Sequence, residues 1–224
     1  EADGTILVQF PYNEATISRL ANWYGAVPLP PYIKDERHEL EAYQTIYADA
    51  EREGSVAAPT AGFHFTEELV EKIKHQRVSF ADVTLHVGLG TFLPVKTERI
   101  EDHTMHAEWV EVSEETAQKI RQAKHEGRRV IAVGTTTVRT LEAVALLKNK
   151  EIQEYTGDIN LFITPGFEFQ VVDALITNFH LPKSTLLMLV AAFVGDTEFI
   201  LDCYKKAVEE KYRFYSFGDA MFIF

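Results

Sequence analysis

Histidines next to predicted strand ends and loops are the side chains best suited to chemistry in this sequence. His64 lies in the loop A-A-P-T-A-G-F-H-F-T, and His86 lies near the carboxyl end of a strand predicted over 83–87. His106 and Glu108 are two residues apart in an alternating segment, so a strand would project both from one face. A carboxylate beside an imidazole raises its basicity and orients it, which suits acid–base catalysis. An edge strand with a polar outer face explains this spacing equally well.

A strand followed by Gly-Thr-Thr and a helix is typical of an anion site. The apolar run R-V-I-A-V precedes Gly134, Thr135 and Thr136, and a helix is predicted from Val138 to Leu147. Free backbone N–H groups, hydroxyls and the positive end of the helix dipole would meet there. Arg139 would add a bidentate partner for a carboxylate or phosphate. The segment has neither the lysine of a nucleotide P-loop nor the three glycines of a dinucleotide site.

Composition narrows the classes of function. The chain has 224 residues, of which 46% are apolar, and its formal net charge of −12 disfavours charge-driven binding of nucleic acid outside a local basic patch. Cys203 is the only cysteine, so we expect no disulfide framework and a reducing cytosol. His103-x-x-His106 lacks further ligands at a supporting spacing, so we expect no metal. The longest apolar run, 186–194, is too short to span a bilayer and predicts a buried helix.

The elements that must position these residues alternate between strand and helix. Asn13 predicts a helix cap before Glu14–Tyr24, Thr66 caps a helix beginning at Glu67, and Ser113 caps one that runs to about Glu126. Further elements are predicted as a strand over 5–10, a weak helix over 34–50 with Tyr43 and Tyr47 on one face, strands over 106–112, 159–164 and 167–177, a helix over 197–212 and a strand over 220–224. This alternation predicts a layered α/β/α domain with a mixed sheet.

The amino-terminal part of the sequence predicts a domain boundary. The segment V-P-L-P-P-Y is a stiff, extended stretch that fits neither a helix nor a central strand, and it divides residues 1–27 from residues 28–224. Asp3-Gly4 is a hairpin-turn pair followed by the predicted strand, but no strand precedes it. We therefore expect that part of an amino-terminal domain is missing from this chain.

Six ordered blocks and a short leading segment resemble one enzyme family. The blocks are A-A-P-T-A-G-F-H-F-T, H-V-G-L-G-T-F-L-P-V, M-H-A-E, G-T-T-T-V-R-T-L-E, I-T-N-F-H-L-P-K-S-T-L-L-M-L-V and Y-R-F-Y-S-F-G-D-A-M, with P-L-P-P-Y-I ahead of them. Together they resemble the S-adenosylmethionine:tRNA ribosyltransferase-isomerases of queuosine biosynthesis, from about Gly4 to the end. Phe63 stands where the family more often has leucine, an apolar exchange that should be harmless.

The resemblance implies a fold and a reaction. It implies that residues 1–27 are the carboxyl-terminal remnant of a small β-barrel with its connecting helix, and that 28–224 form the main α/β catalytic domain. It also implies transfer and isomerisation of the ribosyl unit of S-adenosylmethionine onto 7-aminomethyl-7-deazaguanine at the tRNA wobble position. The products are epoxyqueuosine, adenine and methionine. S-adenosylmethionine is consumed as a substrate, so no cofactor is expected, and the expected protein is a cytoplasmic monomer that does not bind membranes.

Each step of the implied reaction moves a proton, so the reaction needs acids and bases, and histidines are the candidates for both. A base removes the C5′ hydrogen acidified by the sulfonium, the sugar ring opens to release adenine, and the amine captures the freed carbon. The resemblance makes His64, His86, His106 and His180 the acid–base candidates, with Glu108 orienting His106. The candidates for substrate binding are Thr66, Thr91, Thr135, Thr136, Arg139, Asn178 and Asp219. Shared catalysis requires the loops around Phe63, Gly88, Gly134 and Phe179 to meet in one pocket.

Two other functions remain as alternatives. An S-adenosylmethionine-dependent methyltransferase would have a glycine-rich turn after its first strand and an acidic residue at the end of the next strand. Neither Gly88-Leu89-Gly90 nor Gly134-Thr135-Thr136 fits that pattern well. A tRNA-binding module without catalysis is the second alternative, and it would keep its function when the histidines are replaced.

Overall fold

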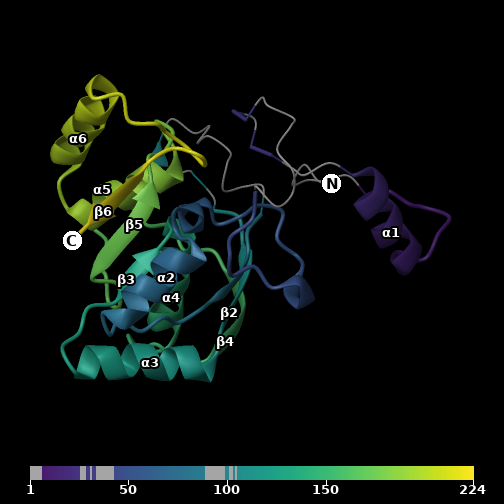
Figure 1. Cartoon of the computed structure of the whole chain (residues 1–224), viewed down its shortest axis with the longest axis horizontal. Coiled ribbons are helices and arrows are strands. Elements are labelled where there is room, and N and C mark those ends of the chain that lie inside the picture. The colour runs from purple at the N-terminus through teal and green to yellow at the C-terminus, as the bar shows by residue number, and fades with distance from the viewer. Residues whose placement is uncertain are drawn as a thin grey trace.

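The computed structural model describes residues 7–25, 29–30, 32–33, 43–88, 99–100, 103 and 105–224, except for the side chain of Asn22. Within these ranges the chain is a mixed α/β protein with six α-helices, two short 3-10 helices and six strands (Figure 1). The helices are α1 Glu14–Tyr24, η2 Ala50–Arg52, η3 Thr60–His64, α2 Glu67–His75, α3 Glu114–His125, α4 Thr135–Leu147, α5 Thr185–Val194 and α6 Thr197–Glu209. The strands are β1 Thr84–His86, β2 Glu108–Val112, β3 Ile131–Val133, β4 Tyr155–Ile159, β5 Ala174–Asn178 and β6 Ala220–Ile223.

The strands form two small sheets. One has the order β1-β2-β4 and is antiparallel throughout, with Leu85 opposite Val110 and Val110 opposite Gly157. The other has the order β3-β5-β6, in which β3 and β5 are parallel and β5 and β6 are antiparallel. The predicted α/β class is confirmed, and the β3-β5-β6 sheet is mixed as predicted. The described strands form two sheets, however, and the other sheet is wholly antiparallel.

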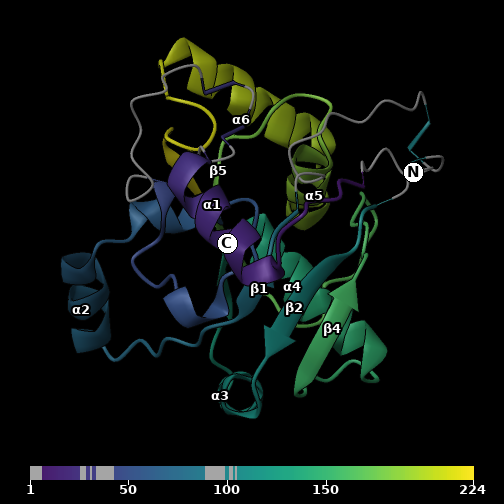
Figure 2. The ribbon, with the colours of Figure 1, turned by 90° about the vertical axis from the view of Figure 1, so that its right-hand side faces the viewer.

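Helix α4 lies between the two sheets and joins their cores. Ten of its thirteen residues are buried, which leaves almost no solvent-facing side in its first three turns. Val138, Leu141 and Val144 belong to the larger core cluster, which includes Leu175 of β5. Ala143 packs instead with Val110 and Ile159 of the other sheet. Helix α4 contacts β3 and β5 of one sheet and β4 of the other, and Figure 2 shows it behind β2 and β4.

Helix starts follow local capping chemistry closely. Asn13, Thr66 and Ser113 each accept a hydrogen bond from the backbone N–H three residues later, as the sequence predicts. Helix α4 begins at Thr135, three residues before the predicted start, because Gly134 occupies the cap position with φ of 92°. Glycine adopts positive φ without steric cost, so the Gly-Thr-Thr segment enters the helix directly.

Several predicted strands have different bounds. Strand β4 spans Tyr155–Ile159 instead of 159–164, and β5 spans Ala174–Asn178 instead of 167–177. The polar Glu154-Tyr155-Thr156-Gly157 stretch conceals β4, since an antiparallel strand with one wet face needs few apolar residues. Strand β2 starts at Glu108, so His106 precedes it.

The amino-terminal residues differ from the predicted strand and helix. Residues 7–10 form no strand and have exposed side chains, whereas residues 5–6 lie outside the described ranges. Helix α1 lies apart from the main body in Figure 1, and its Trp23 and Tyr24 are exposed. Of the helix predicted over 34–50, the described residues from Tyr43 onward contain no α-helix: Tyr43 is in a 3-10 turn, and turns and loop follow up to the first residue of η2. The β-barrel remnant and the boundary at residue 27 stay predictions.

Candidate active site

A cavity of about 410 Å³ lies where loops from distant parts of the chain meet. Its walls come from η3 and the residues before it, from the end of β1, from the start of α4 and from the segment that links β5 to α5. The described residues that line it are Tyr32, 58–61, Val87, 134–136, 177–182, Ser184, Leu186, Tyr215 and Ser216. Of the four loops predicted to meet, those around Gly134 and Phe179 line the cavity, and residues next to the other two, 58–61 and Val87, line it as well, while 89–98 lie outside the described residues. A fifth stretch at residues 215–216 joins them.

The lining is mostly apolar, with a few polar groups and no charged side chain among the described residues. None of the described lining residues is Asp, Glu, Lys or Arg. Hydroxyl and amide groups come from Thr60, Thr136, Thr177 and Asn178 among others, and His180 supplies an imidazole. A cavity of this kind binds a small organic molecule through apolar contact and a few oriented hydrogen bonds.

His180 is a buried, neutral imidazole in this cavity. Its exposed fraction is 8%, and its Nε2 lies 2.9 Å from the Thr177 hydroxyl. Its backbone N–H donates to the Tyr204 hydroxyl at 3.1 Å. Burial penalises the imidazolium and lowers the pKa of His180 to about 4. His180 therefore enters any reaction near neutral pH without a charge.

Acidification should destabilise the protein through His180. The unfolded histidine gains a proton below its ordinary pKa of 6.5, while the folded one stays neutral until about 4, so stability is complete above pH 6.5 and falls toward pH 4. The loss should be about 2.5 kcal/mol, measured by urea unfolding at neutral pH and near pH 4.5. His180→Gln should show a smaller loss on acidification, whereas His75→Gln, at an exposed site, should match the wild type. Equal losses in all three proteins would contradict the prediction.

His64 is linked to the cavity through Asn178 and Thr60. Nε2 of His64 lies 2.9 Å from Nδ2 of Asn178, and the Thr60 hydroxyl donates to Oδ1 of Asn178 at 3.2 Å. Asn178 and Thr60 line the cavity, whereas His64 lies behind them on η3. Asn178 ends β5, which places its amide at the sheet edge that the predicted α/β fold uses for ligands.

Asp219 contributes to this site through electrostatics. Its carboxylate accepts hydrogen bonds from the Arg213 backbone N–H at 2.7 Å and from Nη2 of Arg213 at 2.6 Å, and Arg213 lowers the pKa of Asp219. Burial lowers the pKa of His64, and the nearby Asp219 charge opposes that shift while Arg213 adds to it. Asp219 therefore lies close enough to His64 to influence it, but its direct partner is Arg213.

The first turn of α4 presents backbone donors to the cavity. Thr135 and Thr136 are buried and line the cavity, and Val138 is the first residue whose N–H bonds within the helix, to the Gly134 carbonyl. The N–H groups before it have no intrahelical acceptor and carry the positive end of the dipole. Thr66 has a different place, because its side chain is exposed and caps α2 through the Leu69 N–H.

Arg139 and Glu108 form a buried ion pair away from the cavity lining. Nη1 of Arg139 donates to Oε2 of Glu108 at 2.7 Å, with side chains 4% and 7% exposed, and Nε donates to the Leu161 carbonyl. The structure thus gives Arg139 a protein carboxylate as its partner. His106 is exposed and precedes β2, so the two residues that the sequence grouped as a pair differ in burial. The surroundings of Thr91 lie outside the described residues.

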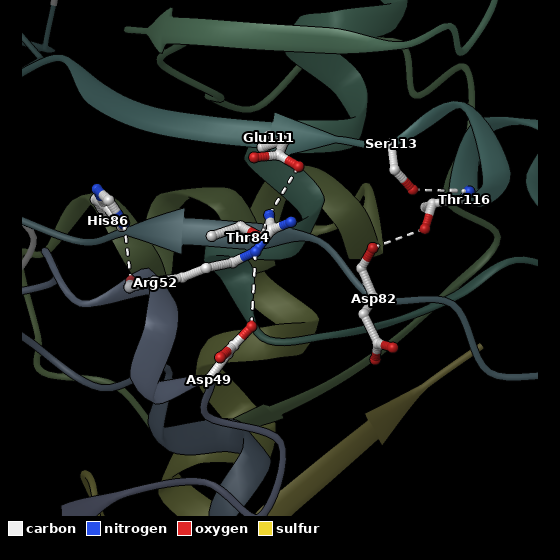
Figure 3. Close-up of polar contacts among 8 residues, drawn as sticks. All are labelled: Asp49, Arg52, Asp82, Thr84, His86, Glu111, Ser113 and Thr116. Atoms are coloured by element: carbon white, nitrogen blue, oxygen red, sulfur yellow. Dashed lines mark hydrogen bonds and ion pairs between the residues drawn. The ribbon is translucent and has the colours of Figure 1, made fainter.

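His86 points to the other face of the antiparallel sheet. Its Nε2 donates to the Arg52 carbonyl at 3.2 Å (Figure 3). Its ring is tilted against that of Trp109, with centroids 4.6 Å apart. Gly54 makes room for the ring, since a Cβ there would lie 2.5 Å from Cε1 of His86. Side chains alternate along a strand, so Val87 reaches the cavity while His86 faces Arg52, which bonds Glu111. His86 is therefore not brought together with His64 and His180.

Sequence reasoning passed over several lining residues. Thr60, Thr177, Ser216, Tyr32 and Tyr215 all belong to blocks that resemble the family, but none was selected individually. The Tyr32 hydroxyl lies 2.8 Å from the Ser216 hydroxyl, and the Tyr32 and Tyr215 rings are 4.9 Å apart. Their position within the blocks was the available signal, because hydroxyls and aromatic rings have no spacing that distinguishes a ligand site from packing.

An α/β fold with a cavity at strand and helix ends is typical of proteins that bind small organic ligands. Comparison with known proteins is more specific. Residues 1–223 match the family described as Queuosine biosynthesis protein, and the chain belongs to that family. No helix among the described residues is both long enough and apolar enough to span a membrane.

Relatives that are similar to this chain are named for one activity. S-adenosylmethionine:tRNA ribosyltransferase-isomerases from Thermotoga petrophila and Natranaerobius thermophilus are 58% and 56% identical over 221 residues, which is 99% of this chain and 63% of theirs. A crystal structure of S-adenosylmethionine tRNA ribosyltransferase from Thermotoga maritima is 52% identical, with a TM-score of 0.62 over 74% of this chain and 51% of that chain. The chain thus spans 63% of the length of these curated relatives and about half of the solved chain.

Proposed function

We propose that this chain contributes the reaction centre of an S-adenosylmethionine:tRNA ribosyltransferase-isomerase. The enzyme would transfer and isomerise the ribosyl unit of S-adenosylmethionine onto 7-aminomethyl-7-deazaguanine at the tRNA wobble position, giving epoxyqueuosine, adenine and methionine. The observation that carries this proposal is the cavity in which four family blocks meet around the neutral His180. The names of the relatives support the choice of reaction.

The cavity suits S-adenosylmethionine in size and chemistry. A volume of about 410 Å³ lies within the range of pockets for small ligands. The donors at the start of α4, near Thr135 and Thr136, suit the methionine carboxylate. The lining has uncharged groups for the adenine and sugar, and His180 is the acid–base candidate in direct reach of a ligand there. His64 would act from behind Asn178.

His106 has a separate role in this proposal. It is exposed and lies outside the described cavity lining, so it would meet the larger tRNA substrate instead of a buried small molecule. Arg139, which is bonded to Glu108, would support the site by fixing α4 against β2. Neither His86 nor Thr66 lines the cavity, so we assign them no contact with S-adenosylmethionine.

Release of adenine tests the proposed reaction. The protein containing this sequence is incubated with S-adenosylmethionine and tRNA bearing the aminomethyl base, and free adenine and modified tRNA are measured by mass spectrometry. His180→Ala and His106→Ala should each lower turnover at least about tenfold. His75→Ala, on the exposed face of α2, is the matched control and should leave turnover unchanged.

The same experiment separates the alternatives. A methyltransferase would leave adenine attached to the sulfur product and add a methyl group to its acceptor. A tRNA-binding module would retain tRNA without consuming S-adenosylmethionine, and the histidine substitutions would not matter. Either result would refute the ribosyltransferase proposal.

A further inference from the structure

Both the oxygen and the nitrogen of the Asn178 side-chain amide have hydrogen-bond partners. Its side chain is 3% exposed, so water cannot readily replace its protein partners. Oδ1 accepts from the Thr60 hydroxyl at 3.2 Å, and Nδ2 lies 2.9 Å from Nε2 of His64. The amide therefore connects the cavity wall at Thr60 to the imidazole behind it.

We propose that Asn178 is a positioning residue that holds neutral His64 with its ring proton on Nδ1. An amide nitrogen only donates hydrogen bonds, so Nε2 of His64 must accept, and an accepting ring nitrogen carries no proton. The remaining nitrogen, Nδ1, must then be the N–H group of the neutral ring. A flipped amide would present its oxygen to the ring and require the proton on Nε2, so one measurement distinguishes the two arrangements.

The charged groups around His64 do not overcome the effect of burial, which favours the neutral imidazole. Asp219 and Arg213 are the ionised side chains that act on it, and they oppose each other. Burial dominates and lowers the pKa of His64, so the ring is neutral near neutral pH. Asp219 is itself bonded to Arg213 through two nitrogens of the guanidinium, at 3.2 and 2.6 Å, which reduces its pull on a proton at His64.

This placement determines what His64 can contribute, and that consequence rests on the proposed function. The Nε2 lone pair is engaged by Asn178, so His64 is poorly placed to remove a proton through that atom. Its Nδ1–H is then the group left to donate a hydrogen bond, from a position outside the cavity lining. His64 would therefore support the site through the Asn178 amide, and removal of the C5′ proton would fall to another group.

Nitrogen-15 NMR of histidine-labelled protein tests the tautomer without substrate. In a neutral imidazole the bare nitrogen resonates far downfield of the N–H nitrogen, and the couplings to the two ring carbons identify each position. The eight histidines are separated by assigning His64 through the signal missing in His64→Gln. The wild type should show Nδ1–H, and a dominant Nε2–H form would overturn the proposal.

Asn178→Asp should reverse the pattern. A carboxylate of the same shape only accepts hydrogen bonds, so it should move the ring proton to Nε2. Asn149→Asp is the matched control, because Asn149 is exposed on the loop after α4 and should leave the His64 signals unchanged. An Asn178→Asp protein that keeps the wild-type tautomer would refute the role of Asn178. If that variant does not fold by circular dichroism, the wild-type spectrum decides alone.

Activity distinguishes this inference from the proposed function. Asn178→Asp should lower kcat at least about tenfold through the reversed tautomer. If the wild type shows Nδ1–H but no adenine is released, the reaction is wrong while the tautomer assignment stands. If adenine is released and the ring carries Nε2–H, the reaction stands and the positioning role of Asn178 fails.

Discussion

Glu142→Ala should lower the free energy of unfolding by about 5 kcal/mol, because it removes the acceptor of three backbone donors at once, two of them buried. The Glu142 side chain is fully buried on α4. Its carboxylate accepts from the N–H groups of Gln170, Val171 and Val172 at 2.7, 3.0 and 2.9 Å. Alanine leaves these donors in the core without a partner, and it also leaves a void.

Urea unfolding followed by circular dichroism measures this loss, with an unchanged slope showing that the unfolded state is the same. Glu142→Gln keeps one oxygen but sets an amide N–H against a donor, so it should cost about half as much. Glu115→Gln on the exposed face of α3 is the control and should change stability by less than about 0.5 kcal/mol. An alanine variant within about 1 kcal/mol of the wild type would show that the segment 170–172 finds other acceptors.

Arg139→Met should cost about 4 kcal/mol, because it leaves the Glu108 carboxylate buried without the guanidinium that neutralises it. The 2.7 Å contact joins α4 to β2 where both side chains are almost completely buried. Methionine fills a similar space, so the loss of stability comes mainly from the unpaired charge and not from a cavity. Chemical unfolding at neutral pH provides the measurement.

A double substitution identifies the cause. Glu108→Gln with Arg139→Met removes both charges, and it should recover more than half of the loss seen in Arg139→Met alone. Arg128→Met is the control for loss of an exposed arginine paired with Glu126, and its effect should be small. Additive losses in the double variant would mean that the pair contributes through packing and not through charge.

Local chemistry accounts for what the sequence predicted well. Asn13, Thr66 and Ser113 locate three helix starts because a cap depends only on the next three residues. The cavity at the ends of β5 and α4 was also predictable, since the family blocks name the loops that form it. The start of α4 was misplaced, because a threonine-rich first turn resembles a loop when Gly134 is not taken as the cap.

Long-range partners account for what the sequence could not predict. His86 and His180 look alike along the chain, yet only His180 faces the cavity, and strand alternation directs His86 toward Arg52. Arg139 resembled an anion-binding residue because nothing nearby in sequence shows that Glu108 is its partner, 31 residues away. The two sheets were merged into one because short strands such as β1 and β3 have three residues each, too few to reveal their neighbours.

The burial of α4 between the two sheets has a consequence for how the protein opens. A helix that is core on both sides cannot detach from one sheet without disturbing the other, so local opening of either sheet should be suppressed. Amide hydrogen exchange should then give similar protection to Val110 in β2 and Leu175 in β5. Each of these residues belongs to one of the two core clusters that α4 joins. The two sheets would behave as one cooperative unit, and a ligand seated at Thr135 would slow exchange in both.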